Sequence, residues 1–296
     1  MNTRTNAQTE SLISIQNLCK SYGDKKVLDG IDLHIKKGRI VGLIGPNGAG
    51  KTTALKCLLG LSTYNGEINV MGLNPLKQRR RLLEEVCFIA DTAILPQWLK
   101  VSQALEYLQG IHPKFDLAKA NRFLSKTSIN RKQKISQLSK GMITQLHLAL
   151  VMAIDAKVLV LDEPTLGLDI LYRKQFYSTL LNDYFDEDRT IIITTHQVEE
   201  IEGLLTDLLF IRDGKIILNR EMEDLEDHFF EVEVRSDKIE IARSLNPIGE
   251  RSVLGGAAFI FEDTEKQGDF IETLEDLGSL STPSIADIFV AKMQNQ

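Results

Sequence analysis

Gly45-Pro46-Asn47-Gly48-Ala49-Gly50-Lys51-Thr52 lies between a short apolar run, residues 40–44, and a segment with the composition of a helix, residues 53–59. The stretch fits the phosphate-binding pattern G-x-x-x-x-G-K-[ST], with the strand before it and the helix after it that the pattern requires. Its glycines let successive backbone N–H groups face one oxyanion, and the helix N-terminus adds a positive partial charge. The alternative is a glycine-rich turn without a ligand, which this strand-and-helix context disfavours.

The individual residues of this loop have predicted roles. Lys51 can pair with the β- and γ-phosphates of a nucleotide, and Thr52 offers a hydroxyl to Mg²⁺. The backbone of the loop is expected to surround the phosphates. The predicted nucleotide contacts are Gly45, Pro46, Asn47, Gly48, Ala49, Gly50, Lys51, Thr52 and Thr53.

A second motif lies 111 positions beyond Lys51, where four apolar residues, 158–161, precede Asp162 and Glu163. The apolar residues predict a buried strand, and the two acids then lie at its carboxyl end. An acidic pair after a strand is weak evidence alone, because strand ends are commonly polar. In combination with the first motif, Asp162 is predicted to hold Mg²⁺ and Glu163 to polarise the attacking water as a general base.

The segments around these motifs alternate between strands and helices. Leu12 to Leu18 alternates as an edge strand would, and buried strands are predicted at 40–44, 158–161 and 190–194. Helices are predicted at 76–86, 102–111, 116–126 and 139–156, and a hairpin at 208–218. This order predicts an α/β fold with a mainly parallel sheet covered on both faces, and a helical subdomain at about 76–150.

Composition limits the class of protein. The chain has 296 residues with 43% hydrophobic and 26% charged residues, which is ordinary for a soluble globular protein. Its apolar runs are far shorter than the roughly 18 residues of a membrane span. Residues 1–10 are polar, unlike a secretory signal, and are expected to be flexible. Three widely spaced cysteines, Cys19, Cys57 and Cys87, have no metal-ligand or redox spacing. We therefore expect a cytosolic chain that reaches a membrane only through a partner.

Charge divides the chain near Glu221. Residues 221–296 hold 18 acidic and six basic residues, a net of −12, whereas residues 1–220 have a net of +6, and the total is −6. The asymmetry predicts a nucleotide-handling body at 11–220 and an acidic accessory domain at 221–296. It disfavours nucleic acid as a partner. Strands are expected at 229–234 and 257–261, which makes the accessory domain a small α+β unit.

Further motifs resemble those of ABC ATPases. Leu138-Ser139-Lys140-Gly141-Met142 is similar to the signature motif, whose usual form is L-S-G-G-Q. Gly167-Leu168-Asp169 resembles the D-loop, and His196 matches the switch histidine. Tyr22, 23 residues before Gly45, occupies the place of an aromatic that stacks on adenine. The resemblance covers residues 12–220 and implies an antiparallel β subdomain beside the parallel sheet and the helical subdomain.

The resemblance also implies a mechanism. Two subunits would enclose ATP and Mg²⁺, with Ser139, Gly141 and Met142 of one subunit contacting nucleotide on the P-loop of the other. Asp169 and His196 would assist Glu163 in hydrolysis. A homodimer is the simplest arrangement, with a heterodimer of similar subunits as the alternative. The dimer would drive an integral membrane permease on separate chains and lie on the cytoplasmic face of the membrane. Residues 283–290 resemble the closing segment of ABC-2-type exporter ATPases, which favours export; a non-transport regulatory role is the alternative.

Purely structural interpretations remain open for several of these residues. Tyr22 could be a packed surface aromatic, His196 a buried structural histidine, and Ser139 or Asp169 a helix cap. Trp98 could be a core anchor or part of a groove for a partner helix. Arg79, Arg80 and Arg81 could be a solvated helix face or a contact with headgroups or a partner.

The sequence departs from the family at two places. Asp91 stands where the Q-loop usually has Gln or Glu, and it keeps an oxygen for Mg²⁺ or water with a shorter reach. The signature ends in Met142 rather than Gln, but Ser139 and Gly141 remain. We therefore expect ATPase activity to survive.

Overall fold

The computed structural model describes residues 11–90, 95–166, 168, 170–263 and 268–294. Its strands are β1 (Ser11–Tyr22), β2 (Lys25–Lys36), β3 (Ile40–Ile44), β4 (Asn65–Val70), β5 (Val86–Ile89), β6 (Val158–Asp162), β7 (Thr190–Thr195), β8 (Asp207–Arg212), β9 (Lys215–Glu221), β10 (Phe229–Arg235), β11 (Gly249–Val253), β12 (Gly256–Glu262) and β13 (Ser279–Ser281). Its α-helices are α1 (Lys51–Leu58), α2 (Arg79–Leu83), α3 (Val101–Ile111), α4 (Leu117–Ser125), α5 (Lys140–Met152), α6 (Ile170–Thr179), α7 (Ile239–Ser244), α8 (Gly268–Leu277) and α9 (Ile285–Gln294). A short 3₁₀ turn, η3 (Val198–Glu200), follows β7.

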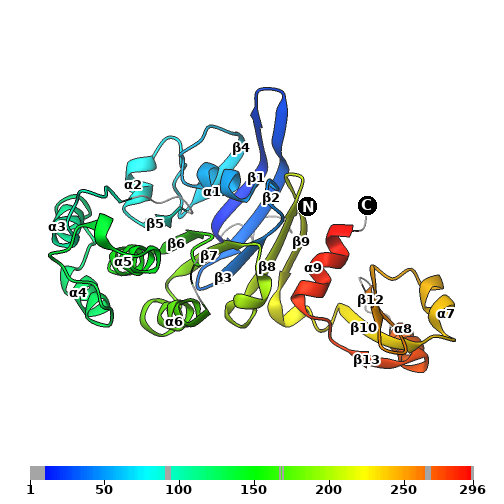
Figure 1. Cartoon of the computed structure of the whole chain (residues 1–296). Helices are drawn as coiled ribbons and strands as arrows, with labels where there is room; N and C mark the ends of the chain where they lie inside the picture. The colour runs from blue at the N-terminus through cyan, green and yellow to red at the C-terminus, as the bar shows by residue number, and fades with distance from the viewer. Residues whose placement is uncertain (1–10, 91–94, 167, 169, 264–267, 295–296) are drawn as a thin grey trace.

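A six-stranded sheet with the order β5-β6-β7-β3-β8-β9 forms the centre of the molecule (Figure 1). Its neighbours are parallel except for the β8–β9 hairpin. Every residue of β3, β6 and β7 is buried, as expected for strands covered on both faces. The predicted mainly parallel sheet is confirmed. Because Ile44 pairs with Thr195 and Asp162 with Thr194, the ends of these strands meet at one edge.

The strand predicted at Leu12 to Leu18 is not an edge strand. In the three-stranded sheet β2-β1-β4 it is β1, the central strand, with antiparallel neighbours on both sides. Its alternation has another cause. Ile13, Ile15 and Leu18 are buried against the hydrophobic cluster around α1, and the residues between them are more exposed. Alternation reports which face of a strand is buried, not how many strands flank it.

Helices α3, α4 and α5 form a separate cluster at one end of the molecule (Figure 1). Its buried residues include Val101, Leu105, Leu124, Leu146 and Leu150. Helix α2 is shorter than the predicted helix at 76–86, and α5 ends at Met152 rather than at 156. Trp98 is 72% exposed, so it does not anchor the core. The side chains of residues 79–81 are exposed too.

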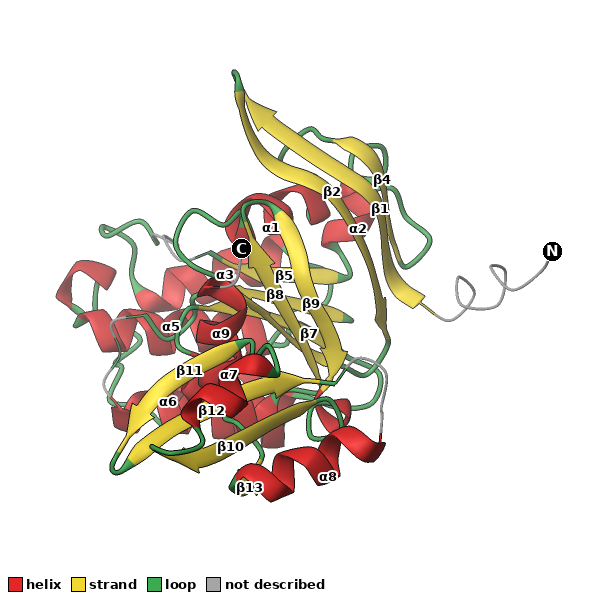
Figure 2. Cartoon of the chain, turned by 90° about the vertical axis from the view of Figure 1, so that its right-hand side faces the viewer, coloured by secondary structure: helices red, strands yellow, loops and turns green. Residues whose placement is uncertain are grey.

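At the opposite end, strands β10 to β13 form an antiparallel sheet with the order β11-β12-β10-β13 (Figures 1 and 2). The chain order strand–helix–strand–strand–helix–strand is that of a split βαβ, ferredoxin-like unit. Helices α7 and α8 cover one face, where Phe259 and Phe261 pack with Leu274 and Leu277. No helix in the described part of the chain is long and apolar enough to cross a membrane.

The C-terminal unit is joined to the central sheet by buried contacts. Strand β9 ends at Glu221, where the sequence predicted a domain boundary. However, Phe229, Ile285 and Ile288 belong to the same hydrophobic cluster as Phe210 and other residues of the six-stranded sheet. The boundary at 221 therefore stays a prediction, and any division there leaves a shared core.

Candidate active site

The phosphate loop connects β3 to α1, as the sequence predicts. Gly50 precedes the helix with a φ of +109°, and a Cβ at Gly45 would lie 2.4 Å from the carbonyl oxygen of Ile211. Gly48, with a φ of +85°, faces open space. The first amides of α1 have no acceptor within the helix. The loop is thus closely packed at Gly45 and Gly50 and open at Gly48, which fits a cradle that a phosphate can approach.

Lys51, the first residue of α1, is only 7% exposed. Its ammonium donates to the carbonyl oxygens of Gly45 at 2.6 Å and Pro46 at 3.4 Å, and lies 3.7 Å from a carboxylate oxygen of Glu163. Burial lowers the pKa of Lys51, while Glu163 and Asp162 oppose that shift. The loop therefore places a cation among acceptors that phosphate oxygens can replace.

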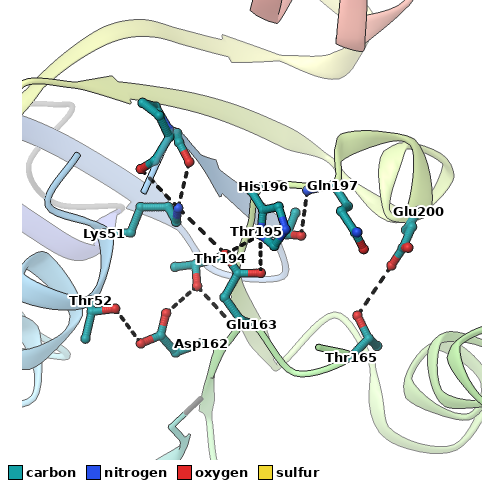
Figure 3. A network of polar contacts seen from close by, with 12 residues as sticks. Lys51, Thr52, Asp162, Glu163, Thr165, Thr194, Thr195, His196, Gln197 and Glu200 are labelled. Carbon is teal, nitrogen blue, oxygen red and sulfur yellow. Dashed lines mark hydrogen bonds and ion pairs between the residues drawn. The ribbon is translucent and has the colours of Figure 1, made fainter. Parts of the chain in front are cut away.

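Asp162 ends β6 and is 1% exposed. One carboxylate oxygen accepts a hydrogen bond from the Thr52 hydroxyl at 2.7 Å, and the other accepts from the Thr194 hydroxyl at 2.5 Å (Figure 3). A hydroxyl and a carboxylate are hard oxygen ligands that suit Mg²⁺. Among the described residues, no group of three or more His, Cys, Asp and Glu side chains could hold a metal. The pair therefore fits a Mg²⁺ that takes its remaining ligands from nucleotide and water.

Glu163 and His196 lie in direct contact. The Nδ1 atom of His196 is 3.0 and 3.1 Å from the two carboxylate oxygens of Glu163 (Figure 3). His196 is exposed, so the alternative of a buried structural histidine is wrong. Glu163 has a φ of +49°, and its amide donates to the carbonyl oxygen of Thr194 at 3.1 Å. Strand β7 thus holds the backbone of Glu163 in a conformation that glutamate rarely adopts.

The side chains of Lys51, Asp162 and Glu163 border one open cleft of about 600 Å³. Tyr22, at the end of β1, lines the cleft and is 52% exposed, with the Lys20 ammonium 4.9 Å from its ring centroid. Stacking of Tyr22 on adenine remains a prediction. The other residues that line the cleft are Lys25, Lys26, Val27, Pro46, Asn47, Gly48, Gly50, Lys51, Thr52, Thr53, Asp162, Glu163, Asp213 and Gly214.

The sequence did not indicate that Asp213 and Gly214 belong to the cleft. Both lie in the β8–β9 turn, which the sequence predicted only as a hairpin. The amide of Gly214 donates to the carbonyl oxygen of Ala49 at 3.1 Å, which fixes the turn against the phosphate loop. Gly214 and Ala49 are 165 positions apart in the sequence, and no local pattern predicts that their turns lie side by side.

The signature residues lie elsewhere. Ser139 is exposed and caps α5, with its hydroxyl oxygen accepting from the amide of Met142 at 3.2 Å. A Cβ at Gly141 would meet nothing nearer than Leu168, at 4.0 Å. None of Ser139, Gly141 and Met142 is among the described residues that line the cleft. The structure thus brings together the phosphate loop, Asp162, Glu163, His196 and Tyr22, but not the signature. The predicted positions Asp91, Gly167 and Asp169 lie outside the described residues.

Arg173 on α6 is a residue that the sequence reading missed. Its Nε atom donates to the carbonyl oxygen of Leu168 at 2.8 Å, and its guanidinium also donates to the side chain of Gln197 at 2.9 Å and pairs with Glu200. Glu200 in turn accepts from the Thr165 hydroxyl at 3.4 Å (Figure 3). Arg173 thus joins the segment after Glu163 to the segment after His196.

The comparisons with known proteins agree with this site. The ABC transporter family profile matches residues 28–166. The ABC transporter ATP-binding protein YtrB of Bacillus subtilis is 26% identical over 285 residues, which cover 95% of this chain and 98% of that protein. The Nod factor export ATP-binding protein I of Cupriavidus metallidurans is 32% identical over 267 residues, 85% of this chain and 86% of that protein.

A solved structure described as the ATP binding subunit of an ABC transporter has the same fold. It superposes with a TM-score of 0.66 at 22% identity and covers 73% of this chain and 92% of that chain. With the sequence relatives and the cleft geometry, this likeness leads to one conclusion: the chain belongs to the ABC transporter family and is an ATP-binding, ATP-hydrolysing subunit.

Proposed function

We propose that the chain hydrolyses ATP with Mg²⁺ in a site shared by two subunits, and that this reaction drives a permease on separate chains for export. One observation carries the proposal. Lys51, Thr52, Asp162 and Glu163 meet at one cleft, while the exposed Ser139 lies outside it. The cleft thus has groups for the phosphates and Mg²⁺ on one side. In our proposal, a second surface brings the signature to the other side of the nucleotide.

Within the cleft, each residue has a distinct task. Lys51 and the amides of the loop bind the phosphates and orient the terminal one. Thr52 and Asp162 would hold Mg²⁺, which supplies positive charge to the phosphate oxygens when bound. Glu163 accepts the proton of the attacking water. The oriented groups contribute mainly positioning and electrostatic stabilisation.

The contact between His196 and Glu163 determines which ring nitrogen of His196 carries a hydrogen. An ionised carboxylate can only accept hydrogen bonds, so the Nδ1 atom of His196 must carry the hydrogen. In the neutral tautomer, the Nε2 atom then has a free lone pair; in the protonated ring, it is a second donor. The protonated form could therefore donate to a phosphate oxygen while Nδ1–H keeps Glu163 oriented.

The second subunit would supply the missing groups. Two copies related by a two-fold axis form two identical sites, each with Ser139, Gly141 and Met142 from the opposite copy. A heterodimer of similar subunits would have the same geometry. Asp169 would act at this interface, and Asp91 would contact Mg²⁺. Both roles are proposed from the positions of these residues in the sequence alone.

Export is supported by similarity and by one exposed side chain. A relative 32% identical is named for Nod factor export, and residues 283–290 resemble the end of exporter ATPases. Trp98 is 72% exposed, which fits an apolar contact for a permease helix. Through such a contact, the chain would lie on the cytoplasmic face of a membrane.

Mixing two inactive variants tests the shared site. Lys51→Ala disables the phosphate-loop half, and Ser139→Ala disables the signature half. In a mixed dimer, one site receives both defects and the other receives none. Single-turnover ATP hydrolysis should therefore recover to about a quarter of the wild-type amount in an equal mixture that has exchanged subunits.

A matched mixture provides the control. Lys51→Ala and Glu163→Gln both disable the phosphate-loop half, so their mixed dimer has one defect in each site and should stay inactive. Recovery in both mixtures, or in neither, would contradict a site built from opposite halves of two subunits.

A further inference from the structure

Helix α9 is packed between the C-terminal sheet and the central sheet (Figures 1 and 2). Toward the C-terminal sheet, Gly249 of β11 lets the helix approach closely, because a Cβ there would lie 2.8 Å from the Cβ of Ala291. The ammonium of Lys292 donates to Glu262 at the end of β12, at 2.5 Å. Phe259 and Phe261 face α7 and α8, so α9 covers the other face of this sheet.

The opposite side of α9 contacts the ATPase region. Ile285 and Ile288 are 2% and 1% exposed and belong to the cluster that includes Phe210, Val198 and Ile201. The rings of Phe289 and Phe210 meet edge to face at a centroid distance of 5.1 Å. Val198 begins η3, two residues after His196. Helix α9 thus packs directly against the segment that carries the switch histidine.

A second connection runs through Arg212, the last residue of β8. Its guanidinium donates to the carbonyl oxygens of Lys292 at 2.9 Å and Met293 at 3.2 Å, in the last turn of α9. A cation stabilises this end of a helix, where carbonyls lack partners within the helix. The next residues, Asp213 and Gly214, line the ATP cleft, and Gly214 bonds to Ala49 of the phosphate loop.

We propose that α9 positions the ATP site. Its docking on Phe210, η3 and Arg212 fixes both the His196 segment and the Asp213–Gly214 turn, so the C-terminal unit sets the rate of hydrolysis. Phe289 and Arg212 act through other residues and are positioning residues. The inference rests on the roles proposed above for Glu163 and His196, but not on export. Docked α9 and bound ATP would favour the same arrangement of these two segments, so binding of ATP should also stabilise α9.

Phe289→Ala in the full-length chain tests the first half of this proposal, with Val290→Ala as the control. Val290 is the next residue of α9 and is 49% exposed. Hydrogen exchange and steady-state ATPase kinetics are measured on both variants. Phe289→Ala should speed exchange in 285–294 and 198–204 and lower kcat about two- to tenfold with a smaller change in KM. Val290→Ala should change neither.

The exchange data keep the test decisive. If α9 exchanges faster in Phe289→Ala while kcat stays at the wild-type value, the proposal is wrong. Should Phe289→Ala fail to fold, Arg212→Lys replaces it, because a lysine keeps the charge but not the planar donor geometry of the guanidinium. The same two readouts and the same overturning result apply.

The reciprocal test uses Glu163→Gln, which is expected to hold ATP without turnover. Addition of ATP and Mg²⁺ should slow exchange in 285–294, and unchanged exchange there with ATP bound would overturn the coupling. The two proposals can fail separately. A wild-type hydrolysis rate in Glu163→Gln refutes the assignment of the base, whereas the effect of Phe289→Ala on kcat would stand.

Discussion

The six-stranded and the four-stranded sheets of this chain use β-structure in different ways. In the first, the ends of β3, β6 and β7 meet at one edge and place Lys51, Asp162 and Glu163 beside one cleft, with His196 in contact with Glu163. The second carries none of the predicted site residues, and its faces are occupied by packing helices. The six-stranded sheet positions reactive groups, so activity there depends on individual side-chain atoms. The four-stranded sheet is covered by helices, so its contribution depends on how its side chains pack.

The largest expected effect on activity is in the six-stranded sheet. Glu163→Gln removes the proton acceptor while keeping the size of the side chain, so kcat should fall by about 10²- to 10⁴-fold. ATP binding should persist, and a sizing column with ATP should show a trapped dimer. A hydrolysis rate equal to that of the wild type would remove the basis for placing the chemistry at this edge.

The packed sheet should respond in stability instead. Phe259 is fully buried against α7 and α8, so Phe259→Ala should lower the free energy of unfolding by about 3–5 kcal/mol. Denaturant unfolding measures this change. Well below the transition, kcat should stay near the wild-type value, because Phe259 faces away from α9. A loss of kcat comparable with that of Glu163→Gln would break the distinction between the two sheets.

A pair of glycines compares the two regions directly. Gly214 in the ATP cleft has a φ of +76°, and a Cβ there would lie 2.3 Å from the carbonyl oxygen of Val27. Gly255 in the β11–β12 turn has a φ of +87° with open space around it. Gly255→Ala should cost only about 1 kcal/mol for the left-handed backbone, without effect on the KM for ATP.

Gly214→Ala should cost about 1–3 kcal/mol and also raise the KM, because the turn must move away from Val27, which disturbs its hydrogen bond to Ala49 of the phosphate loop. Thermal unfolding and ATPase kinetics separate the two contributions. Equal KM values in the two variants would show that the turn does not shape the cleft.

The smallest effect concerns the cysteines, all of which lie in the ATPase region. Burial raises the pKa of Cys57 to about 11 and that of Cys87 to about 12, so the reactive thiolate is scarce at neutral pH. Cys19 is partly exposed. A thiol reagent should therefore label Cys19 alone in the folded chain and all three after denaturation. In Phe259→Ala the pattern should stay the same; labelling of Cys57 or Cys87 would show that the loss of packing spreads into the ATPase region.

The sequence predicts the reactive sheet far better than the packed one. The phosphate loop and the acids after β6 leave local patterns, because a glycine turn or a buried strand constrains neighbouring residues. The C-terminal unit has no such pattern. Two of its strands, at 229–234 and 257–261, were predicted, while β11, β13 and the strand order were not, since they depend on pairing between distant segments.

Long-range contacts account for the other gaps. The pairing of β1 with β4, the contact of Gly214 with Ala49 and the bond of Arg173 to Gln197 all join segments that are not adjacent in sequence. The alternation of β1 could not distinguish an edge strand from a central one. The exposure of Trp98 excluded one of two interpretations that the sequence left open.

The backbone of Glu163 has an evolutionary consequence. A φ of +49° costs a glutamate about 1–2 kcal/mol relative to a residue suited to that region, such as glycine. Selection for stability alone would therefore favour glycine or asparagine at this position, whereas selection for turnover retains glutamate. A redesign guided only by folding energy would replace this residue, and it would yield a more stable protein that no longer hydrolyses ATP.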